Sequence, residues 1–244
     1  MNKNYYLVID TETVNGIVTV DKNGKEKLDL TQSLCYDIGW CICDKKGNIV
    51  KERSYVVLET FIDYPDLMRS GYYADKLQRY YEDLNSGKRY ILPIVKIWSN
   101  FLSDLKKYNI TAVCAYNMSF DYRSLNNTLR YITKSKYRTF IPKYVDIFCI
   151  MKMVNSFLPQ RKSYRTFCFN NGLVTKHKTP RPQVKAETVY RYITPNQIDF
   201  IESHTGLEDA QIECKIMAYC FRQHKHLNKR LFEDREVIKR ENSV

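Results

Sequence analysis

The 244-residue sequence predicts one domain of mixed α/β class. Three apolar, β-rich runs follow one another near the start, and from Pro65 onward the apolar residues take helical spacing, interrupted by two further short apolar runs. The chain is long enough to bury a core without disulfide bonds, and no repeat, low-complexity tract or linker divides it. We therefore expect a single domain that carries insertions.

The first three strands are expected at residues 5–10, 33–44 and 49–58, and their succession indicates an antiparallel meander. Asn23 and Gly24, which lie between short extended runs, indicate a small hairpin inserted between the first two strands. The later apolar runs AVCAY and YVDIFCI predict two more buried strands. These two runs occupy residues 112–116 and 144–150.

Helices are expected at 72–85 and 93–107, where the apolar residues recur at helical spacing. Ser119 is a plausible N-cap for a third helix that ends near Tyr131. The chain after residue 150 is mostly helical in pattern, with a break at 179–183 and a mixed-charge helical tail at about 222–244.

Several classes of protein are disfavoured by the composition. The eight cysteines are scattered rather than framed, no secretory signal opens the chain, and no apolar run approaches the roughly 18 residues that span a bilayer. We expect a cytoplasmic protein that does not enter membranes. Zinc is a weak alternative, because Cys41 and Cys43 have no C-x-x-C partner and Cys214 falls in an apolar helical stripe, although it lies close in sequence to Cys220, His224 and His226.

The positive charge is concentrated in one segment, residues 122–185. Fourteen Lys and Arg face one acid there, so the segment carries +13 and the rest of the chain −1. Tyr and Phe are interleaved with these cations, which is typical of surfaces that neutralise phosphates and stack bases. The alternative is a solvated basic surface above core aromatics.

Four carboxylates stand where strands end or helices begin. Asp10 and Glu12 are two apart at the end of a strand, so both project from one face of the sheet. Asp121 lies in the first turn of a helix that directly follows a strand, and Asp209 opens a late helix, five residues after His204. Taken singly, each acid also suits a helix N-terminus or a turn.

Together the three stretches DTE (10–12), NMSFD (117–121) and HTGLED (204–209) resemble, in order and spacing, the three motifs of the DEDD family of 3′ to 5′ exonucleases, in its histidine branch. Thr205 stands where the sister branch has a tyrosine. The resemblance covers most of the chain and implies a ribonuclease H-like sheet of five strands, three antiparallel and then parallel additions, with helices on both sides. Gly206 replaces the alanine common in the family, and we expect looser packing there.

The resemblance also implies the roles of these residues. Asp10, Glu12, Asp121 and Asp209 would hold two divalent cations, Mg²⁺ or Mn²⁺, because converging carboxylates repel one another unless cations keep them ionised. His204 would then accept the proton of the attacking water, since its unperturbed pKa is near 6.5.

Contacts to the substrate are implied less directly. The resemblance suggests that Thr11 and Thr13 lie near the terminal nucleotide and that Asn117 and Phe120 shape the pocket behind the third acid; Phe120 suits the core equally well. The insertions at about 13–31 and 59–92 are longer than those of a minimal member and bear on how substrate enters.

We expect hydrolysis of single-stranded nucleic acid from its 3′ end to nucleoside monophosphates, with DNA favoured. No polymerase or helicase segment accompanies the motifs, so the protein would act alone or as a separate subunit beside a polymerase or other replication partner. Two alternatives stay open. One is a ribonuclease that trims RNA 3′ ends, because the contact that reads a 2′-hydroxyl cannot be located in the sequence. The other is a non-catalytic module on the same fold that binds nucleic acid or a partner protein.

Overall fold

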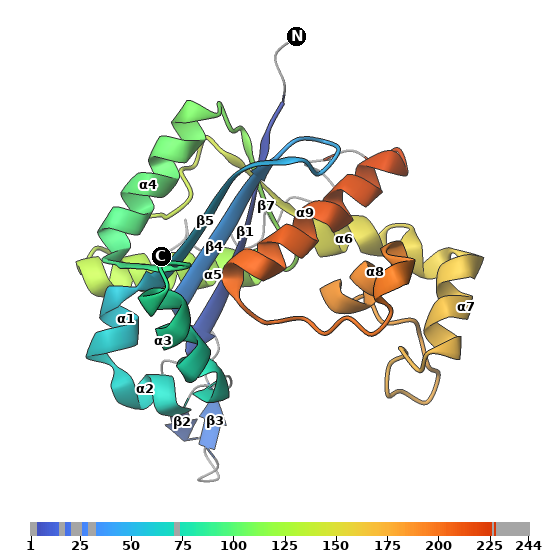
Figure 1. The fold of residues 1–244 in the computed structure, drawn as a ribbon, viewed down its shortest axis with the longest axis horizontal. Helices are drawn as coiled ribbons and strands as arrows, with labels where there is room; N and C mark the ends of the chain where they lie inside the picture. The colour runs from blue at the N-terminus through green and yellow to red at the C-terminus, as the bar shows by residue number, and fades with distance from the viewer. Residues whose placement is uncertain are drawn as a thin grey trace.

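The computed structural model describes residues 4–14, 18–20, 26–28, 33–70, 74–225 and 227. Among them, six strands form one sheet in the order β6-β5-β4-β1-β7-β8 (Figure 1). The strands β1, β4 and β5 pair antiparallel, and β6, β7 and β8 join in parallel. Their bounds are β1 Tyr6–Val14, β4 Leu34–Cys43, β5 Ile49–Val57, β6 Tyr90–Leu92, β7 Ala112–Ala115 and β8 Asp146–Cys149.

The expected mixed sheet is confirmed: three antiparallel strands carry parallel additions. The sheet gains one strand beyond the five expected, because β6 pairs with the edge strand β5. With three residues, β6 is too short to show the alternation that marks a strand in a sequence.

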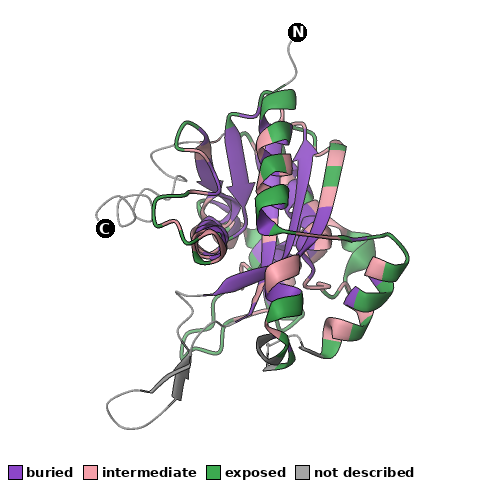
Figure 2. Cartoon of the chain, turned by 90° about the vertical axis from the view of Figure 1, so that its left-hand side faces the viewer, coloured by how far each residue is buried: buried purple, intermediate pink, exposed green. Residues whose placement is uncertain are grey.

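Helices cover both faces of the sheet, as expected (Figure 1). Alternation along β1 sends Leu7 and Ile9 into a core with α4 and α5, and sends Tyr6 and Val8 into a second core with α9. Figure 2 shows the strands buried almost throughout, whereas the helices keep exposed outer faces. The bounds are α4 Ile94–Lys107 and α5 Met118–Thr133 on one face, and α6 Ile150–Asn155, α8 Ala186–Ile193 and α9 Gly206–Arg222 on the other.

Both insertions contain structure. In the first, β2 (Val18–Val20) pairs antiparallel with β3 (Glu26–Leu28), which confirms the pairing expected of a hairpin. The turn predicted at Asn23 and Gly24 lies outside the described residues. In the second, the helix expected at 72–85 is confirmed from residue 74 onward, as η2 (Ala74–Lys76) followed by α3 (Leu77–Asn85), whereas residues 72 and 73 lie outside the described part of the chain. Two short helices before it, α1 (Leu58–Asp63) and α2 (Pro65–Ser70), were not expected, because six residues give too few turns for an apolar stripe.

The helix of the second motif begins differently from the expectation. Ser119 was expected as its N-cap, but α5 starts at Met118 with Asn117 in the N-cap position, so that prediction is wrong. The strand β7 ends at Ala115, and the turn that follows leaves room for only two residues before the helix. Ser119 therefore lies inside the first turn, where its hydroxyl contacts the Asn117 side chain at 3.4 Å.

The last third is helical, and its predicted break at 179–183 is confirmed as an extended stretch between α7 (Lys162–Asn170) and α8. The 3₁₀ turns η3 (Leu158–Gln160) and η4 (Pro195–Gln197) flank this region. The tail predicted at about 222–244 lies almost wholly outside the described residues. Within the described part of the chain, no helix combines the length and apolar character that crossing a bilayer requires. All eight cysteines are free and buried.

Candidate active site

The first two carboxylates lie on the central strand of the sheet. Asp10 and Glu12 project from the face of β1 that α9 covers, because Tyr6 and Val8, at the same parity, pack against α9. Glu12 is buried, and Asp10 is half-buried. A strand flanked by β4 and β7 cannot move freely, so these side chains have a rigid base.

Asp121 reaches the same region from α5, on the other face of β1. Its Oδ1 accepts two hydrogen bonds from Thr11, one from the backbone N–H at 3.1 Å and one from the hydroxyl at 2.9 Å. Both bonds are buried, and they fix the carboxylate against the strand that carries Asp10 and Glu12. Since one oxygen holds both bonds, the other is left to a further partner.

The third motif brings a histidine and an acid to the same place. His204 lies in the loop before α9 with a left-handed backbone (φ 51°), and Asp209 lies in the first turn of the helix. Each of Glu12, His204 and Asp209 offers a ligand atom, and these three atoms all lie within 4.8 Å of one another. Strained left-handed backbone at a non-glycine residue is typical of functional sites.

Burial raises the pKa values of these carboxylates, and at Asp10 the charges of neighbouring acids add to the effect. Burial, and then the charges of Glu213 and Asp121, raise the pKa of Asp10 well above its ordinary value. Burial chiefly raises the pKa of Asp121 to about 7, although its bonds from Thr11 act in the opposite direction. Burial and the charge of Glu202 raise the pKa of Asp209 to about 8. Without cations, this cluster is therefore reluctant to ionise.

The histidine is poised to be neutral. Burial and the positive charge of Lys76 lower the pKa of His204 below its ordinary value. Its Nδ1 lies 3.9 Å from an Oε2 of Glu202, whose own pKa burial raises to about 7. A neutral imidazole can accept a proton, and the nearby carboxylate would stabilise the cation that forms.

The residues suit a divalent metal by their chemistry. Asp209 Oδ1 is buried and has no hydrogen-bond partner among the described residues, so one carboxylate oxygen of this cluster member is unsatisfied. Carboxylate oxygens are the ligands that Mg²⁺ and Mn²⁺ prefer. An acidic cluster with an unsatisfied oxygen and raised pKa values is what a cation would stabilise.

A fifth buried acid at this site was missed in the sequence. Glu213 lies one turn after Asp209 on α9, and its Oε2 accepts the backbone N–H of Tyr116 at 3.0 Å. That bond attaches α9 to the end of β7, just before the motif that carries Asp121. The signal was its spacing, since residues four apart share one face of a helix.

A second missed acid, Asp37, lies on β4 and is completely buried. Its Oδ2 accepts bonds from Gly206 N at 3.0 Å, Tyr80 Oη at 2.6 Å and Arg89 Nη1 at 2.9 Å. Arg89 also donates from Nε to Asp83 at 2.8 Å. A buried arginine therefore ties the second insertion to the strand next to β1 and to the start of α9.

The start of α9 approaches β4 very closely. A Cβ built on Gly206 would lie 2.7 Å from Gly39 N and 3.0 Å from Asp10 O, and one built on Gly39 would lie 2.0 Å from Leu207 N. The expectation that Gly206 loosens the packing is therefore wrong. Two glycines face each other because no side chain fits between the two backbones, and the close approach sets Asp209 beside β1.

The second insertion also forms a wall of the site. Lys76 Nζ donates to the carbonyl of Ser203 at 2.6 Å, directly before His204. Arg79 Nη2 donates to both carboxylate oxygens of Glu208, at 2.6 and 2.8 Å. These contacts hold the histidine loop from outside. No local pattern in the sequence predicts them, because the partners lie more than 120 residues apart.

The residues expected to touch substrate are distributed around this cluster. Thr11 is buried, with its hydroxyl turned toward Asp121, whereas Thr13 is partly exposed on the same strand. Asn117 is exposed ahead of α5, and Phe120 is half-buried in its first turn. Thr13 and Asn117 are thus open to a ligand, and Thr11 supports a carboxylate.

Neither a protein-family model nor a curated protein matches the sequence. Solved structures are similar at low identity. An exonuclease X in complex with 5′ overhanging duplex DNA is 14% identical over 93% of this chain and 96% of its own, with a TM-score of 0.42. Pop2p of S. pombe, in a form with Mg²⁺ and Mn²⁺ bound, is 12% identical over 93% and 87%, with a TM-score of 0.49. E. coli exonuclease I in complex with single-stranded DNA is 11% identical over 91% and 42%, also at 0.49.

Proposed function

We propose that this chain is a metal-dependent 3′ to 5′ exonuclease that removes nucleoside monophosphates from single-stranded nucleic acid. One observation carries the proposal: Glu12, His204 and Asp209 present ligand atoms within 4.8 Å of one another, beside the further carboxylates Asp10 and Asp121. Histidine and carboxylates that converge on one point, with raised acid pKa values, suit phosphodiester hydrolysis assisted by cations.

In this proposal Asp10, Glu12, Asp121 and Asp209 would hold two divalent cations, Mg²⁺ or Mn²⁺, and these ions would supply the Lewis-acid chemistry of phosphodiester hydrolysis. His204, neutral because burial and Lys76 lower its pKa, takes the proton of the attacking water. Thr11 holds Asp121 in place through its two hydrogen bonds. Thr13, Asn117 and Phe120 are proposed to face the terminal nucleotide.

The substrate is proposed to be DNA, with RNA as the second candidate. The two polymers differ at the 2′-hydroxyl, so the rates of release from DNA and from RNA of one sequence distinguish them. A non-catalytic module is disfavoured by the unsatisfied Asp209 oxygen and by the mutual repulsion of the acids, because a merely binding site would not need to bury them together. We further propose that the whole chain acts as one exonuclease domain, and its free cysteines suit a reducing compartment such as the cytoplasm.

The test is the release of nucleoside monophosphates from single-stranded DNA and RNA, resolved by chromatography, with Mg²⁺, with Mn²⁺ and with a chelator. Either metal should support release, and Asp209→Asn should abolish it. The matched control is Asp63→Asn, which removes an exposed acid at the end of α1 and should leave the rate unchanged. Binding of strands without any release under either metal would contradict the proposal.

A further inference from the structure

We propose that α7 and the loop after it form a binding subsite for single-stranded nucleic acid, outside the carboxylate cluster, that holds the strand upstream of its 3′ end. This role for the subsite rests on the proposed exonuclease function. Binding by this surface does not depend on hydrolysis, so it can be measured without catalysis.

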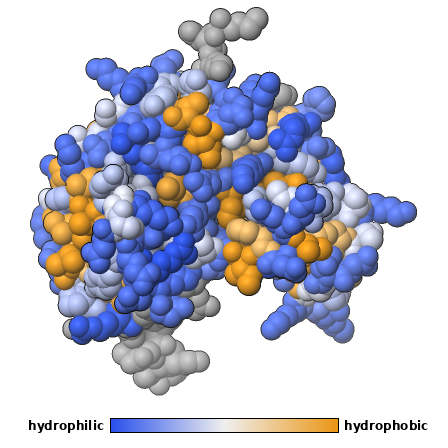
Figure 3. Space-filling view, in the orientation of Figure 1, coloured by the Kyte–Doolittle hydropathy of each residue, from blue (hydrophilic) through white to orange (hydrophobic). Residues whose placement is uncertain are grey.

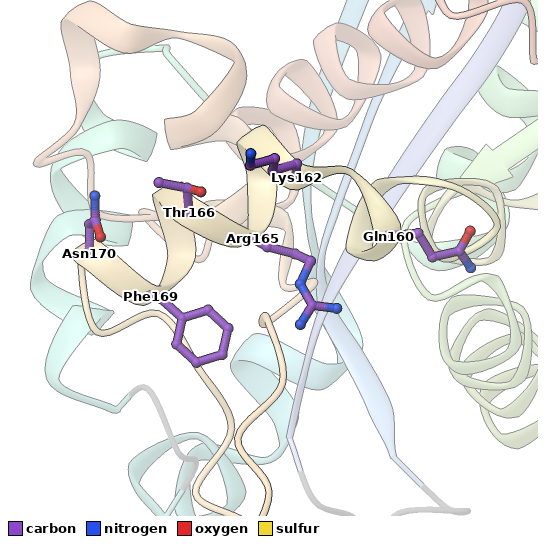
Figure 4. Close-up of a pocket in the computed structure, with 6 residues that line it drawn as sticks. All are labelled: Gln160, Lys162, Arg165, Thr166, Phe169 and Asn170. Atoms are coloured by element: carbon purple, nitrogen blue, oxygen red, sulfur yellow. The ribbon is translucent and has the colours of Figure 1, made fainter.

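One face of α7 lines a surface hollow of about 560 Å³ (Figure 4). The spacing of its lining residues, at 162, 165, 166, 169 and 170, follows the i, i+3, i+4 rule of a single helical face. The lining consists of two cations, one aromatic ring and three neutral polar side chains, and contains no acid. Its members are Gln160, Lys162, Arg165, Thr166, Phe169 and Asn170.

The segment of chain that carries this hollow is rich in cations and free of acids. Between Asp146 and Glu187 the sequence has no acid at all. Six exposed cations lie on α7 and the following loop, and none of them forms an ion pair within the described residues. A phosphate backbone would supply the charges that the protein does not. The six are Lys162, Arg165, Lys176, Lys178, Arg181 and Lys185.

Phe169 supplies the second element of recognition. Its side chain keeps 48% of its area exposed, and it lies on the same face as Arg165, as Figure 4 shows. An aromatic ring beside cations offers stacking to a base while the cations take the phosphates on either side. This pairing suits a single strand, because the bases of a duplex are not available to stack.

The platform beneath is rigid. On the opposite face of α7, Tyr164 and Cys168 are completely buried. Tyr164 packs edge-on against Tyr192 of α8, with ring centroids 4.9 Å apart, and its hydroxyl donates to the carbonyl of Gln183 at 2.5 Å. The helix therefore presents its outer face in one orientation, and the returning loop is fastened to it.

The loop leads from α7 to the active site. Gln183 N donates to Leu173 O at 2.9 Å, which closes the loop on itself before it enters α8. Lys185, at the start of α8, acts electrostatically on both Glu202 and His204. In the space-filling view the surface is hollowed between the lobe of α1–α3 and the lobe of α7 and α8, whose outer edge is hydrophilic (Figure 3). A strand whose 3′ end meets His204 can thus continue past Lys185 toward Arg165.

The binding test uses fluorescence anisotropy of labelled 20-nucleotide DNA and RNA in chelator, where no hydrolysis occurs. Lys162→Ala/Arg165→Ala should weaken binding on the order of tenfold at moderate salt, and should reduce the slope of log affinity against log salt by about 1.4, for two lost phosphate contacts. Phe169→Ala should weaken it roughly fivefold or more, and Phe169→Trp should restore it.

The controls remove matched groups elsewhere. Lys96→Ala/Lys106→Ala takes two exposed cations from α4, on the far side of the sheet, and Tyr90→Ala takes an exposed ring from β6. Both should bind as the unaltered protein does. Equal binding by the α7 variants and these controls would overturn the subsite. A second pair of results would also overturn it: inorganic polyphosphate competes as well as DNA does, and Phe169→Ala has no effect on binding. Together these results would describe a surface that binds any anion.

The catalytic arm separates this proposal from the function it rests on. With Mn²⁺, the α7 double variant should lose about tenfold in kcat/KM on a 20-nucleotide strand, yet keep its rate on the p-nitrophenyl ester of thymidine 5′-monophosphate, which is too small to reach α7. If the unaltered protein hydrolyses neither substrate while the α7 variants still lose binding, the function fails and the subsite stands. If the protein hydrolyses both substrates and the α7 double variant keeps its full kcat/KM on the 20-nucleotide strand, the subsite is wrong and the exonuclease function stands.

Discussion

Asp37 accepts a hydrogen bond from the backbone of Gly206 at 3.0 Å, although 169 residues separate them. The bond joins β4 to the start of α9, between His204 and Asp209. Arg89 and Tyr80, both from the second insertion, bind the same carboxylate oxygen. The insertion is therefore continuous with the candidate active site through one buried acid, and its stability and that of the site are linked.

The Asp37–Arg89 pair gives a prediction for stability. Both side chains are almost fully buried, so Arg89→Leu, which leaves the Asp37 charge without a cation, should destabilise the protein by about 3 to 5 kcal/mol. Asp37→Asn should cost less, because Asp83 still pairs with Arg89. The double variant should cost clearly less than the sum of the two. Urea unfolding of the four proteins measures this cycle. Additive losses would show that the two groups do not interact.

Gly206→Ala tests the close approach of α9 to β4. A Cβ there meets backbone atoms, which cannot rotate away, so we expect a loss of about 1 to 3 kcal/mol and a displaced Asp209 with impaired metal binding. The matched control is Gly87→Ala, where a Cβ meets nothing within 4 Å and only the left-handed backbone (φ 73°) opposes it. Thermal unfolding and Mn²⁺ titration of both variants provide the comparison. Full metal affinity in Gly206→Ala would rule out this role for the contact.

The acids predict how stability depends on pH without metal. The pKa values of Asp121 and Asp209 in the folded protein, about 7 and about 8, exceed the roughly 3.9 of an unfolded chain. The folded state therefore binds more protons, and the stability these groups contribute is full below about pH 4 and is lost as the pH rises through 7 to 8.

In chelator, the melting temperature should accordingly fall between pH 5.5 and 8.5, and Asp209→Asn should flatten that decline. Mn²⁺ should raise the melting temperature more at pH 8 than at pH 5.5, because the cation replaces the protons. Scanning fluorimetry across the pH range measures both effects. A melting temperature that rises with pH in chelator would show that the pKa values of these acids are not raised in the folded protein.

His204→Ala separates a proton acceptor from a metal ligand. As an acceptor, His204 should be needed for turnover, and its loss should reduce kcat on the order of a hundredfold or more, with little effect on Mn²⁺ affinity. Calorimetric titration with Mn²⁺ measures the affinity, and single-turnover hydrolysis measures the rate. A parallel loss of both would make the histidine a ligand, which its place beside Glu12 and Asp209 also permits.

Much of the fold could be predicted from the sequence because local patterns determine it. Long strands such as Leu34–Cys43 carry enough apolar residues to be recognised, and Asn23-Gly24 signals a hairpin. The three-residue β6 and the six-residue α1 carry no such pattern, since their stability comes from packing against the rest of the sheet.

The residues of the candidate active site also differ in whether the sequence predicts them. His204 and Asp209 could be predicted because the family's motifs keep a constant order and spacing along the chain. Asp37 and Arg89 were not, because their partners are distant in sequence and appear only when β4, α3 and α9 meet. The position of Glu213 one turn after Asp209 predicts that the two acids share a helical face, but the apolar residues around Glu213 mask this signal by indicating an ordinary buried face.

The direction of cleavage along the strand is the most direct test of the proposed 3′ to 5′ exonuclease activity. Single-stranded DNA and RNA of one sequence, labelled at the 5′ end or at the 3′ end, are incubated with the protein and Mn²⁺ and resolved on a denaturing gel. We expect a ladder that shortens from the 3′ end with the 5′ label, immediate release of a labelled mononucleotide with the 3′ label, and neither product for Asp10→Ala. Internal cuts, shortening from the 5′ end, or an intact strand with both metals would contradict it.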